Sequence, residues 1–172
     1  TLKRLQWSHA PAAAIAAGMF RDEIVPVVVK ERKSERTVDV DEGPRPNTTA
    51  EGLASLRPVF QKDGTVTAGN ASILSDGAAA VVVADESTAV AAPWRFKILA
   101  SHTAGTEPRD LFIAPVAAVE GAVRRAGLTP AEIDLFELNE AFASQMVACA
   151  RQLKIDPERV NLYGGGISLG HP

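Results

Sequence analysis

The sequence has only one cysteine, Cys149, among its 172 residues. A single cysteine excludes a disulfide within the chain and fits a reducing compartment, which is the cytoplasm or the matrix of an organelle. Cys149 lies among Met146, Val147 and Ala150 in a stretch with helical spacing. We therefore expect it to be a small buried hydrophobic side chain and not a reactive thiol.

Long hydrophobic runs and a basic excess are also missing. No apolar stretch approaches the roughly 18 residues that cross a bilayer, and the run 77–84 ends at Asp85 and Glu86. Residues 2–7 carry two basic side chains but no apolar core follows them, so we expect no signal peptide. The formal net charge of -3 would not attract nucleic acid or an anionic membrane. We expect neither partner.

The composition and the order of the elements predict a folded α/β chain. With 46% hydrophobic and 23% charged residues, the sequence resembles ordinary globular proteins and not disordered ones. Strand patterns alternate with helical patterns from residue 95 onward, which predicts right-handed crossovers and a mostly parallel sheet. The expected strands are 23–30, 37–41, 65–68, 80–84, 95–101, 135–138 and 160–163, and the expected helices are 50–57, 115–126 and 140–153.

Local signals mark several boundaries of these elements. Pro58 should end the first helix because proline cannot donate the next backbone hydrogen bond. Gly127 stands where a helix prefers glycine at its C-terminal end, and Thr129 with Glu132 forms a capping-box pattern. The run 80–84 is continuously apolar, as expected of a strand covered on both faces.

Three clusters of residues are candidates for a site. In the first, residues 64–79, Gly69 and Gly77 would let the backbone approach a ligand while Ser72 offers a hydroxyl. The alternative is a hairpin followed by a tight turn. In the second, Asn139 could hold a water or polarise a carbonyl oxygen, and Glu140 could act as a general base. The alternative is that both serve only the start of the following helix.

The third cluster begins with three consecutive glycines, residues 164–166, and ends with His171 between Gly170 and Pro172. This placement favours a working imidazole over a histidine of the core. His9 and His102 have no such context, and we expect both in loops or on the surface.

In this order and spacing, the three clusters resemble the thiolase family, the enzymes that make or cleave 3-ketoacyl thioesters of coenzyme A. The matching segments read GTVTAGNAS and DGAAA, then NEAFA, then LGHP. The resemblance extends from about residue 8 to the end of the sequence, with lesser matches at residues 18–26, 41–46, 56–58 and 126–129. It implies an acyltransferase that carries out Claisen condensation of acetyl-CoA or thiolytic cleavage of 3-ketoacyl-CoA.

The resemblance also implies the roles of the catalytic residues. His171 would activate a nucleophilic cysteine and donate toward a thioester oxygen, and Asn139 would hold a water beside it. Together they would form an oxyanion hole for the enolate that arises when an acetyl group loses its α-proton. A ketoacyl synthase would have a histidine in place of Asn139, which argues against that related class.

Four further residues match positions of the family that contact the substrate. Arg45 and Ser72 would contact the nucleotide and pantetheine parts of coenzyme A, while Ala141 and Phe142 would line the thioester channel. The planar fork of an arginine suits phosphate oxygens, although a solvated loop arginine is the alternative for Arg45. The resemblance implies no metal and no cofactor, since the coenzyme A thioester is the substrate.

The sequence departs from an active thiolase at its cysteines. The nucleophilic cysteine is expected upstream of Thr1 and an acid/base cysteine downstream of Pro172, and neither is in this sequence. We therefore expect this segment alone to be inactive, and a non-catalytic thioester-binding or interaction module is the alternative function. Ile73 replaces a glycine of many members and could narrow the pantetheine channel, whereas Gly166 replaces a common alanine, a change that we expect to be harmless.

The family's layered α-β-α fold also predicts how the chain is divided. Residues 1–74 would be the end of an inserted loop domain, residues 75–94 the last part of the N-terminal half, and residues 95–172 the first part of the C-terminal half. The fold in this segment would therefore be incomplete. The resemblance implies that the complete enzyme is a homodimer or homotetramer.

Overall fold

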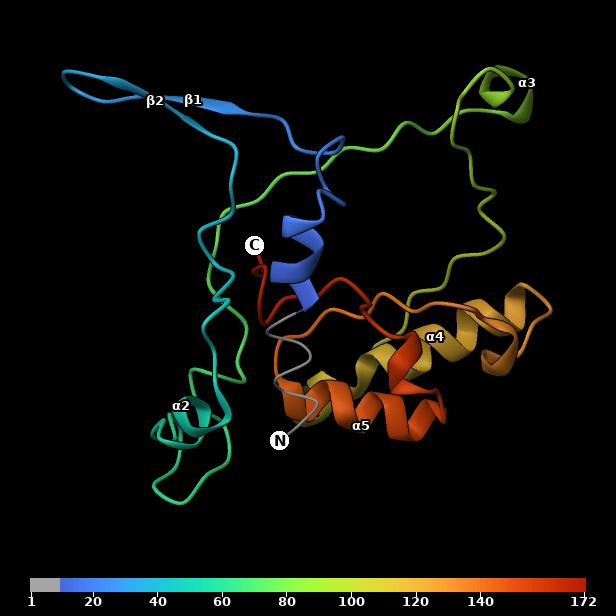
Figure 1. Cartoon of the computed structure of the whole chain (residues 1–172). Coiled ribbons are helices and arrows are strands. Elements are labelled where there is room, and N and C mark those ends of the chain that lie inside the picture. The colour runs from blue at the N-terminus through green and yellow to red at the C-terminus, as the bar shows by residue number, and fades with distance from the viewer. Residues whose placement is uncertain (1–9) are drawn as a thin grey trace.

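The computed structural model describes residues 10–172 and divides into a helical part and a more extended part (Figure 1). Residues 10–16 are helical. The strands are β1 (Val27–Lys30) and β2 (Glu35–Val38), and the α-helices are α2 (Ala50–Ala54), α3 (Glu86–Ala89), α4 (Ala114–Arg125) and α5 (Ala143–Leu153). Three 3-10 turns, η1 (Pro108–Ile113), η2 (Pro130–Glu132) and η3 (Pro157–Arg159), flank α4 and α5. None of the helices within residues 10–172 has the length and apolar character needed to cross a membrane.

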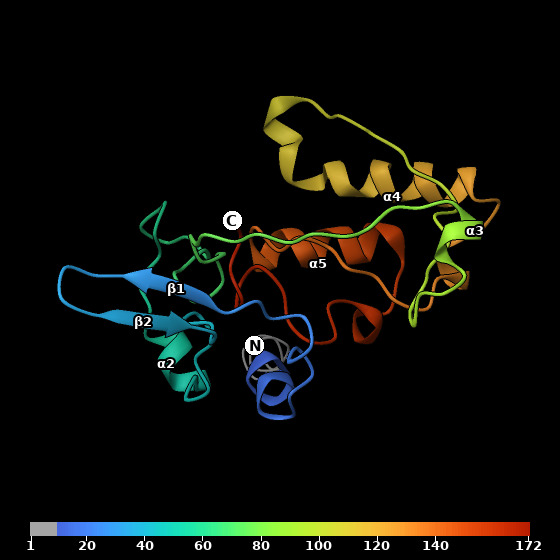
Figure 2. The same cartoon turned by 90° about the horizontal axis from the view of Figure 1, so that it is seen from above.

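The core lies between α4, α5 and the chain that runs beside them (Figures 1 and 2). On α5, buried residues recur every three or four positions, which gives the helix one apolar face. The buried cluster consists of Phe136, Met146, Ala150, Leu153, Ile155 and Val160, and Val116, Val119, Ile133 and Leu138 pack against it. This part of the chain is therefore held together by ordinary apolar burial.

The C-terminal end of α4 and the turn that follows it both agree with the local sequence signals. Gly127 has a φ of +73°, a left-handed conformation that glycine adopts readily at the end of a helix. At η2, the Glu132 carboxylate accepts hydrogen bonds from the backbone N–H of Thr129 at 2.8 Å and from its hydroxyl at 2.7 Å. The hydroxyl contact, followed by the backbone contact, lowers the pKa of Glu132.

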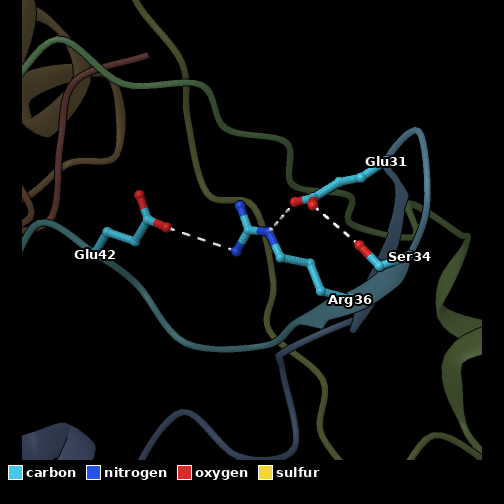
Figure 3. Close-up of polar contacts among 4 residues, drawn as sticks. All are labelled: Glu31, Ser34, Arg36 and Glu42. Atoms are coloured by element: carbon cyan, nitrogen blue, oxygen red, sulfur yellow. Dashed lines mark hydrogen bonds and ion pairs between the residues drawn. The ribbon is translucent and has the colours of Figure 1, made fainter.

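Strands β1 and β2 form an antiparallel hairpin that extends away from the helices (Figure 1). The first predicted strand, 23–30, is confirmed in its second half, since β1 begins only after Pro26. The second, predicted at 37–41, is shifted, because β2 ends at Val38 and overlaps the prediction at Thr37 and Val38 alone. Figure 3 shows the polar contacts of Arg36 on β2. Its Nε lies 3.4 Å from Oε1 of Glu31, and its Nη1 lies 3.9 Å from Oε1 of Glu42. Because these ion pairs are exposed, they contribute little to stability.

The prediction of a mostly parallel sheet is wrong for the described residues. Within residues 10–172 the sheet is the β1–β2 hairpin, and the remaining pairing consists of isolated bridges, of which Phe136 with Val160 is parallel. Segments 65–68, 80–84 and 95–101 do not form strands. A strand needs a neighbour to accept its backbone hydrogen bonds, and 80–84 and 95–101 pass through an open loop around α3 (Figure 1).

The apolar run at residues 80–84 is consequently uncovered. Val81, Val82 and Val83 are 88%, 97% and 74% exposed, although a run of this kind was expected to be buried on both faces. The short helix α3 that follows was not predicted. Its cap is Asp85, whose carboxylate accepts from the Ser87 hydroxyl and the Thr88 N–H, contacts that lower its pKa to about 2.

Candidate active site

The three sequence clusters meet in the structure, with residues 70–74 lying between the other two. On one side, the Ser72 N–H donates to the Ala141 carbonyl at 2.9 Å, and the Ala143 N–H donates to the Asn70 carbonyl at 2.9 Å. These bonds flank an antiparallel bridge between Ala71 and Phe142. The first cluster is therefore paired with the second.

On its other side, the same segment holds the chain that carries His171. The Ile73 N–H donates to the Gly166 carbonyl at 3.2 Å, and the His171 N–H donates to the Ile73 carbonyl at 2.9 Å. Leu74 and His171 form a parallel bridge. The backbone of residues 70–74 thus fixes the separation of the second and third clusters.

Within this frame, the side chains of Asn139 and His171 are in contact. The amide nitrogen of Asn139 lies 3.1 Å from Nε2 of His171, and both side chains face the exterior. The prediction that these two residues meet is confirmed, and the contact is direct. It is a hydrogen bond from the amide when the imidazole is neutral and carries its proton on Nδ1.

Asn139 does not cap the following helix, so the alternative given for it is wrong. Helix α5 begins three residues later than predicted, at Ala143, and the residue before it, Phe142, has an extended backbone. Gln145 links the start of α5 to Asn139. Its side-chain carbonyl accepts from the Phe142 N–H at 3.3 Å, and its side-chain amide donates to the Asn139 carbonyl at 3.4 Å. Asn139 therefore projects from an extended segment.

Glu140, the neighbour of Asn139, is completely buried. Its carboxylate accepts hydrogen bonds from the side-chain amide of Asn161 at 2.8 Å and from the Ile167 N–H at 3.3 Å. Burial raises the pKa of Glu140, and the Asn161 and Ile167 hydrogen bonds partly counteract this shift. The alternative that Glu140 lies in the first turn of α5 and serves only the helix dipole is therefore wrong, because α5 begins at Ala143.

Three aromatic rings converge at Phe142, three residues after Asn139 in the sequence. The half-buried ring of Phe142 packs edge to face against Phe60 at a centroid distance of 6.1 Å and against Phe112 at 5.1 Å. Phe60 and Phe112 remain exposed on their outer sides. No sequence pattern indicates this cluster, since its three members come from separate segments of the chain.

Arg45 lines a cavity of about 240 Å³ on the other side of Ile73. Its walls come from the loop before α2, from α2 itself and from the loop before His171, and they include Gly43, Thr49, Ile167 and Ser168. Ser72 does not belong to this lining and is instead engaged through its backbone with Ala141. Gly69 and Ile73, which precede and follow Ser72 in the sequence, do line the cavity, so the segment that carries Ser72 borders it.

The glycines of the first cluster have structural reasons for being small. A Cβ on Gly69 would lie 2.5 Å from a methyl carbon of Leu53 and 2.7 Å from one of Leu56. A Cβ on Gly77 would lie 2.9 Å from the ring of Pro172. The close approach at Gly69 is to the side chains of the α2 region, and that at Gly77 is to the chain end beside His171.

Cys149 is buried, as predicted, with 2% of its surface exposed. Its thiol donates to the Phe112 carbonyl at 3.6 Å, and burial raises its pKa, so it stays protonated. His102 lies in a loop, as expected, where it is half-buried and packs on Gly121 of α4. His9 lies outside the described residues. Within residues 10–172, no group of three or more histidine, cysteine or acidic side chains could hold a metal ion.

Two family models match consecutive parts of the chain. Residues 7–87 match the model described as thiolase, N-terminal domain, and residues 92–172 match the model described as thiolase, C-terminal domain. Together the two matches include the Asn139–His171 contact, the Arg45 cavity and the β1–β2 hairpin.

Curated proteins of similar sequence are thiolases and acetyltransferases. The chain is 48% identical over 158 residues to the mitochondrial 3-ketoacyl-CoA thiolase of Bos taurus, and the aligned region covers 91% of this chain and 40% of that protein. It is 50% identical over 163 residues to the acetyl-CoA acetyltransferase of Pseudomonas aeruginosa, which covers 93% of this chain and 42% of that protein. The chain thus spans about 40% of the length of these relatives.

Solved structures give the same result. Human mitochondrial 3-ketoacyl-CoA thiolase in complex with CoA matches with a TM-score of 0.86 and 45% identity, over 99% of this chain and 42% of that one. The dimeric peroxisomal thiolase of Saccharomyces cerevisiae matches with a TM-score of 0.88 and 42% identity, again over 99% of this chain and 42% of that one.

Proposed function

Because the chain belongs to the thiolase family and has the fold of part of a thiolase chain, we propose that it carries half of a thiolase active site. The reaction is acyl transfer to or from coenzyme A, either Claisen condensation of acetyl-CoA or thiolytic cleavage of 3-ketoacyl-CoA. The contact between Asn139 and His171 is the observation that carries this proposal.

The geometry of that contact suits an oxyanion hole. Two nitrogens 3.1 Å apart can both reach one oxygen at an ordinary hydrogen-bond distance of about 2.9 Å. When a thioester loses its α-proton, negative charge develops on its carbonyl oxygen, and donors placed there in advance stabilise the transition state. Asn139 and His171 would supply these donors once Nε2 of His171 carries a proton, when the Asn139 amide turns from Nε2 to the thioester oxygen, directly or through a water held by Asn139.

His171 would have a second role in activating a nucleophile. An imidazole titrates near neutral pH and can take the proton of a cysteine thiol. Cys149 cannot be that cysteine, because its thiol is buried and donates to the Phe112 carbonyl. The nucleophilic and acid/base cysteines would therefore come from sequence outside these 172 residues.

Coenzyme A would bind along the two features that flank Ile73. The Arg45 cavity offers a cation for phosphate oxygens, and Ser72 and Ala141 are hydrogen-bonded to each other on the side toward Asn139. Phe142, with Phe60 and Phe112 against it, offers an apolar wall for the thioester end. We assign Arg45 and Ser72 to the coenzyme, and Ala141 and Phe142 to the thioester channel.

Two similar thiolases support a proposal for the assembly of the complete enzyme. One similar thiolase is dimeric and another has CoA bound, so we propose a complete enzyme that forms a homodimer or homotetramer and binds coenzyme A. The single cysteine is consistent with a cytoplasmic or organelle-matrix enzyme. Residues 1–74 would end its loop domain, and residues 95–172 would begin its C-terminal half.

The test compares two proteins, the 172-residue chain and the complete enzyme that contains it. Thiolysis of acetoacetyl-CoA and condensation of acetyl-CoA are measured for both against a blank without protein. We expect turnover from the complete enzyme and none from the 172-residue chain. A complete protein that binds acetyl-CoA without turning it over would instead support the non-catalytic binding module.

A further inference from the structure

A carboxylate with no exposed surface lies next to the two proposed oxyanion-hole residues. Glu140 is one of the largest fully buried side chains among the described residues. The structure pairs it with two neutral donors, Asn161 and the Ile167 N–H, and not with a cation. Burying a carboxylate in this way is costly, so these contacts require an explanation.

Asn161 uses its whole side chain to join two segments. Its Oδ1 accepts from the Leu138 N–H at 2.8 Å, while its Nδ2 donates to the Leu138 carbonyl at 2.7 Å and to Oε1 of Glu140 at 2.8 Å. The backbone of Asn161 has a φ of +50°, a conformation that asparagine tolerates better than most residues. The residues on both sides of Asn139 are therefore bonded to a single side chain.

The second oxygen of Glu140 reaches the loop that ends at His171. Oε2 accepts from the Ile167 N–H at 3.3 Å, within the glycine-rich segment. No side chain fits at Gly165, where a Cβ would lie 2.6 Å from Cδ of Glu140. Glu140 thus ties the segment of Asn139 to the loop of His171 through its buried side chain, and the backbone of Ser72 and Ile73 ties the same two segments through hydrogen bonds to Ala141, Gly166 and His171.

We propose that Glu140 is a positioning residue that holds Asn139 and His171 in register through Asn161 and Ile167. This inference rests on the proposed thiolase activity. A general base at this position is excluded by geometry, because both carboxylate oxygens are occupied inside the protein and neither is exposed to a substrate. The role depends on the hydrogen-bonding pattern and not on a carboxylate at position 140.

A double-mutant cycle in the complete enzyme separates these possibilities. In Glu140→Gln, the one remaining side-chain oxygen can accept from Asn161 or from Ile167 but not from both, because the new amide faces the other group, donor against donor. In Asn161→Asp, two buried carboxylates face each other. The double variant E140Q/N161D restores the contact in reverse. The new amide at position 140 donates to the new carboxylate at position 161 and still accepts from Ile167, and only the Leu138 carbonyl loses its donor.

We expect each single variant to lower kcat per folded active site by about 10- to 100-fold, as for groups displaced by up to about 1 Å. The KM for acetoacetyl-CoA should change by less than about threefold, because the coenzyme contacts are untouched. The double variant should return to within about threefold of the wild type and be clearly faster than either single variant. Leu153→Ala, which damages the core away from the site, should lower the melting temperature without lowering kcat per folded site.

Two results of the turnover assay would overturn the inference. The first is an unchanged kcat in Glu140→Gln. The second is a double variant as slow as the single variant Glu140→Gln, which would mean that position 140 needs a carboxylate. If Glu140→Gln does not fold, the shorter Glu140→Asp is measured with the same expectation.

Exchange of the Ile167 amide hydrogen provides a readout independent of turnover. It should accelerate in Glu140→Gln and recover in the double variant, and unchanged exchange would overturn the inference even if the complete enzyme proved inactive.

Discussion

The amide nitrogen of Asn139 lies 3.1 Å from Nε2 of His171, although 32 residues separate them in the chain. If the two side chains act as one oxyanion hole, neither can work without the other. We expect Asn139→Ala and His171→Ala each to lower kcat of the complete enzyme by about 10²- to 10³-fold, as for loss of one oxyanion-hole donor.

The combined variant Asn139→Ala/His171→Ala tests whether the two act as a unit. Groups that act together are strongly non-additive, so the double variant should lose about as much activity as the slower single variant. Turnover of acetoacetyl-CoA in the three variants provides the comparison. Independent losses that multiply would show that the contact has no shared function.

Cys149→Ala should leave turnover nearly unchanged. The thiol is 2% exposed, and its contact is a weak hydrogen bond to the Phe112 carbonyl. We expect kcat within about twofold of the wild type and a loss of about 1 kcal/mol in the free energy of unfolding, the usual size for a small core change. A large fall in kcat with normal folding would mean that the cysteine takes part in the reaction.

Arg45→Ala should weaken coenzyme A binding without changing the chemistry. A contact far from the reacting carbon stabilises the ground and transition states equally, so the apparent KM for CoA should rise while kcat stays constant. Loss of one charged hydrogen bond corresponds to about a tenfold rise. The matched control is Arg36→Ala. Arg36 lies on β2, is paired with Glu31 and Glu42 (Figure 3) and does not line the Arg45 cavity, so its removal should not affect KM.

The helices were largely predictable because their signals are local. Helix α4 follows the apolar spacing of residues 115–126, and Gly127 and Thr129 end it and begin the next turn as expected. The sheet was not predictable in the same way, because a strand exists only if another segment lies beside it. Residues 80–84 have a strand sequence and remain unpaired in the described chain.

The site was predictable in part for the same reason. The resemblance placed Asn139 and His171 in one oxyanion hole, and the structure confirms their contact. The burial of Glu140 was not predictable, since a glutamate after an asparagine is typical of an exposed helix start. Its partner Asn161 lies 21 residues away and belongs to none of the sequence clusters.

The two adjacent glycines, Gly165 and Gly166, should respond very differently to the same substitution. A Cβ at position 165 would lie 2.6 Å from Cδ of Glu140 and 2.8 Å from the side-chain nitrogen of Asn161, both of which are buried and already hydrogen-bonded. A Cβ at position 166 would lie 3.1 Å from the Glu140 carbonyl and 3.2 Å from Oδ1 of Asn139. Neither glycine has a left-handed φ, so the difference is one of space alone.

Gly165→Ala should therefore destabilise the complete enzyme by about 3 kcal/mol, the upper range for overpacking, because the carboxylate cannot move without losing its donors. Gly166→Ala should cost less than about 1 kcal/mol, since shifts of a few tenths of an ångström relieve its contacts. Because the added Cβ would press on the side-chain amide of Asn139, Gly166→Ala should lower kcat, but only a few-fold. A small effect agrees with the expectation from the sequence that glycine and alanine are interchangeable at this position. Urea unfolding and acetoacetyl-CoA thiolysis of the two variants test this order, and a greater loss of stability in Gly166→Ala would contradict the packing around Glu140.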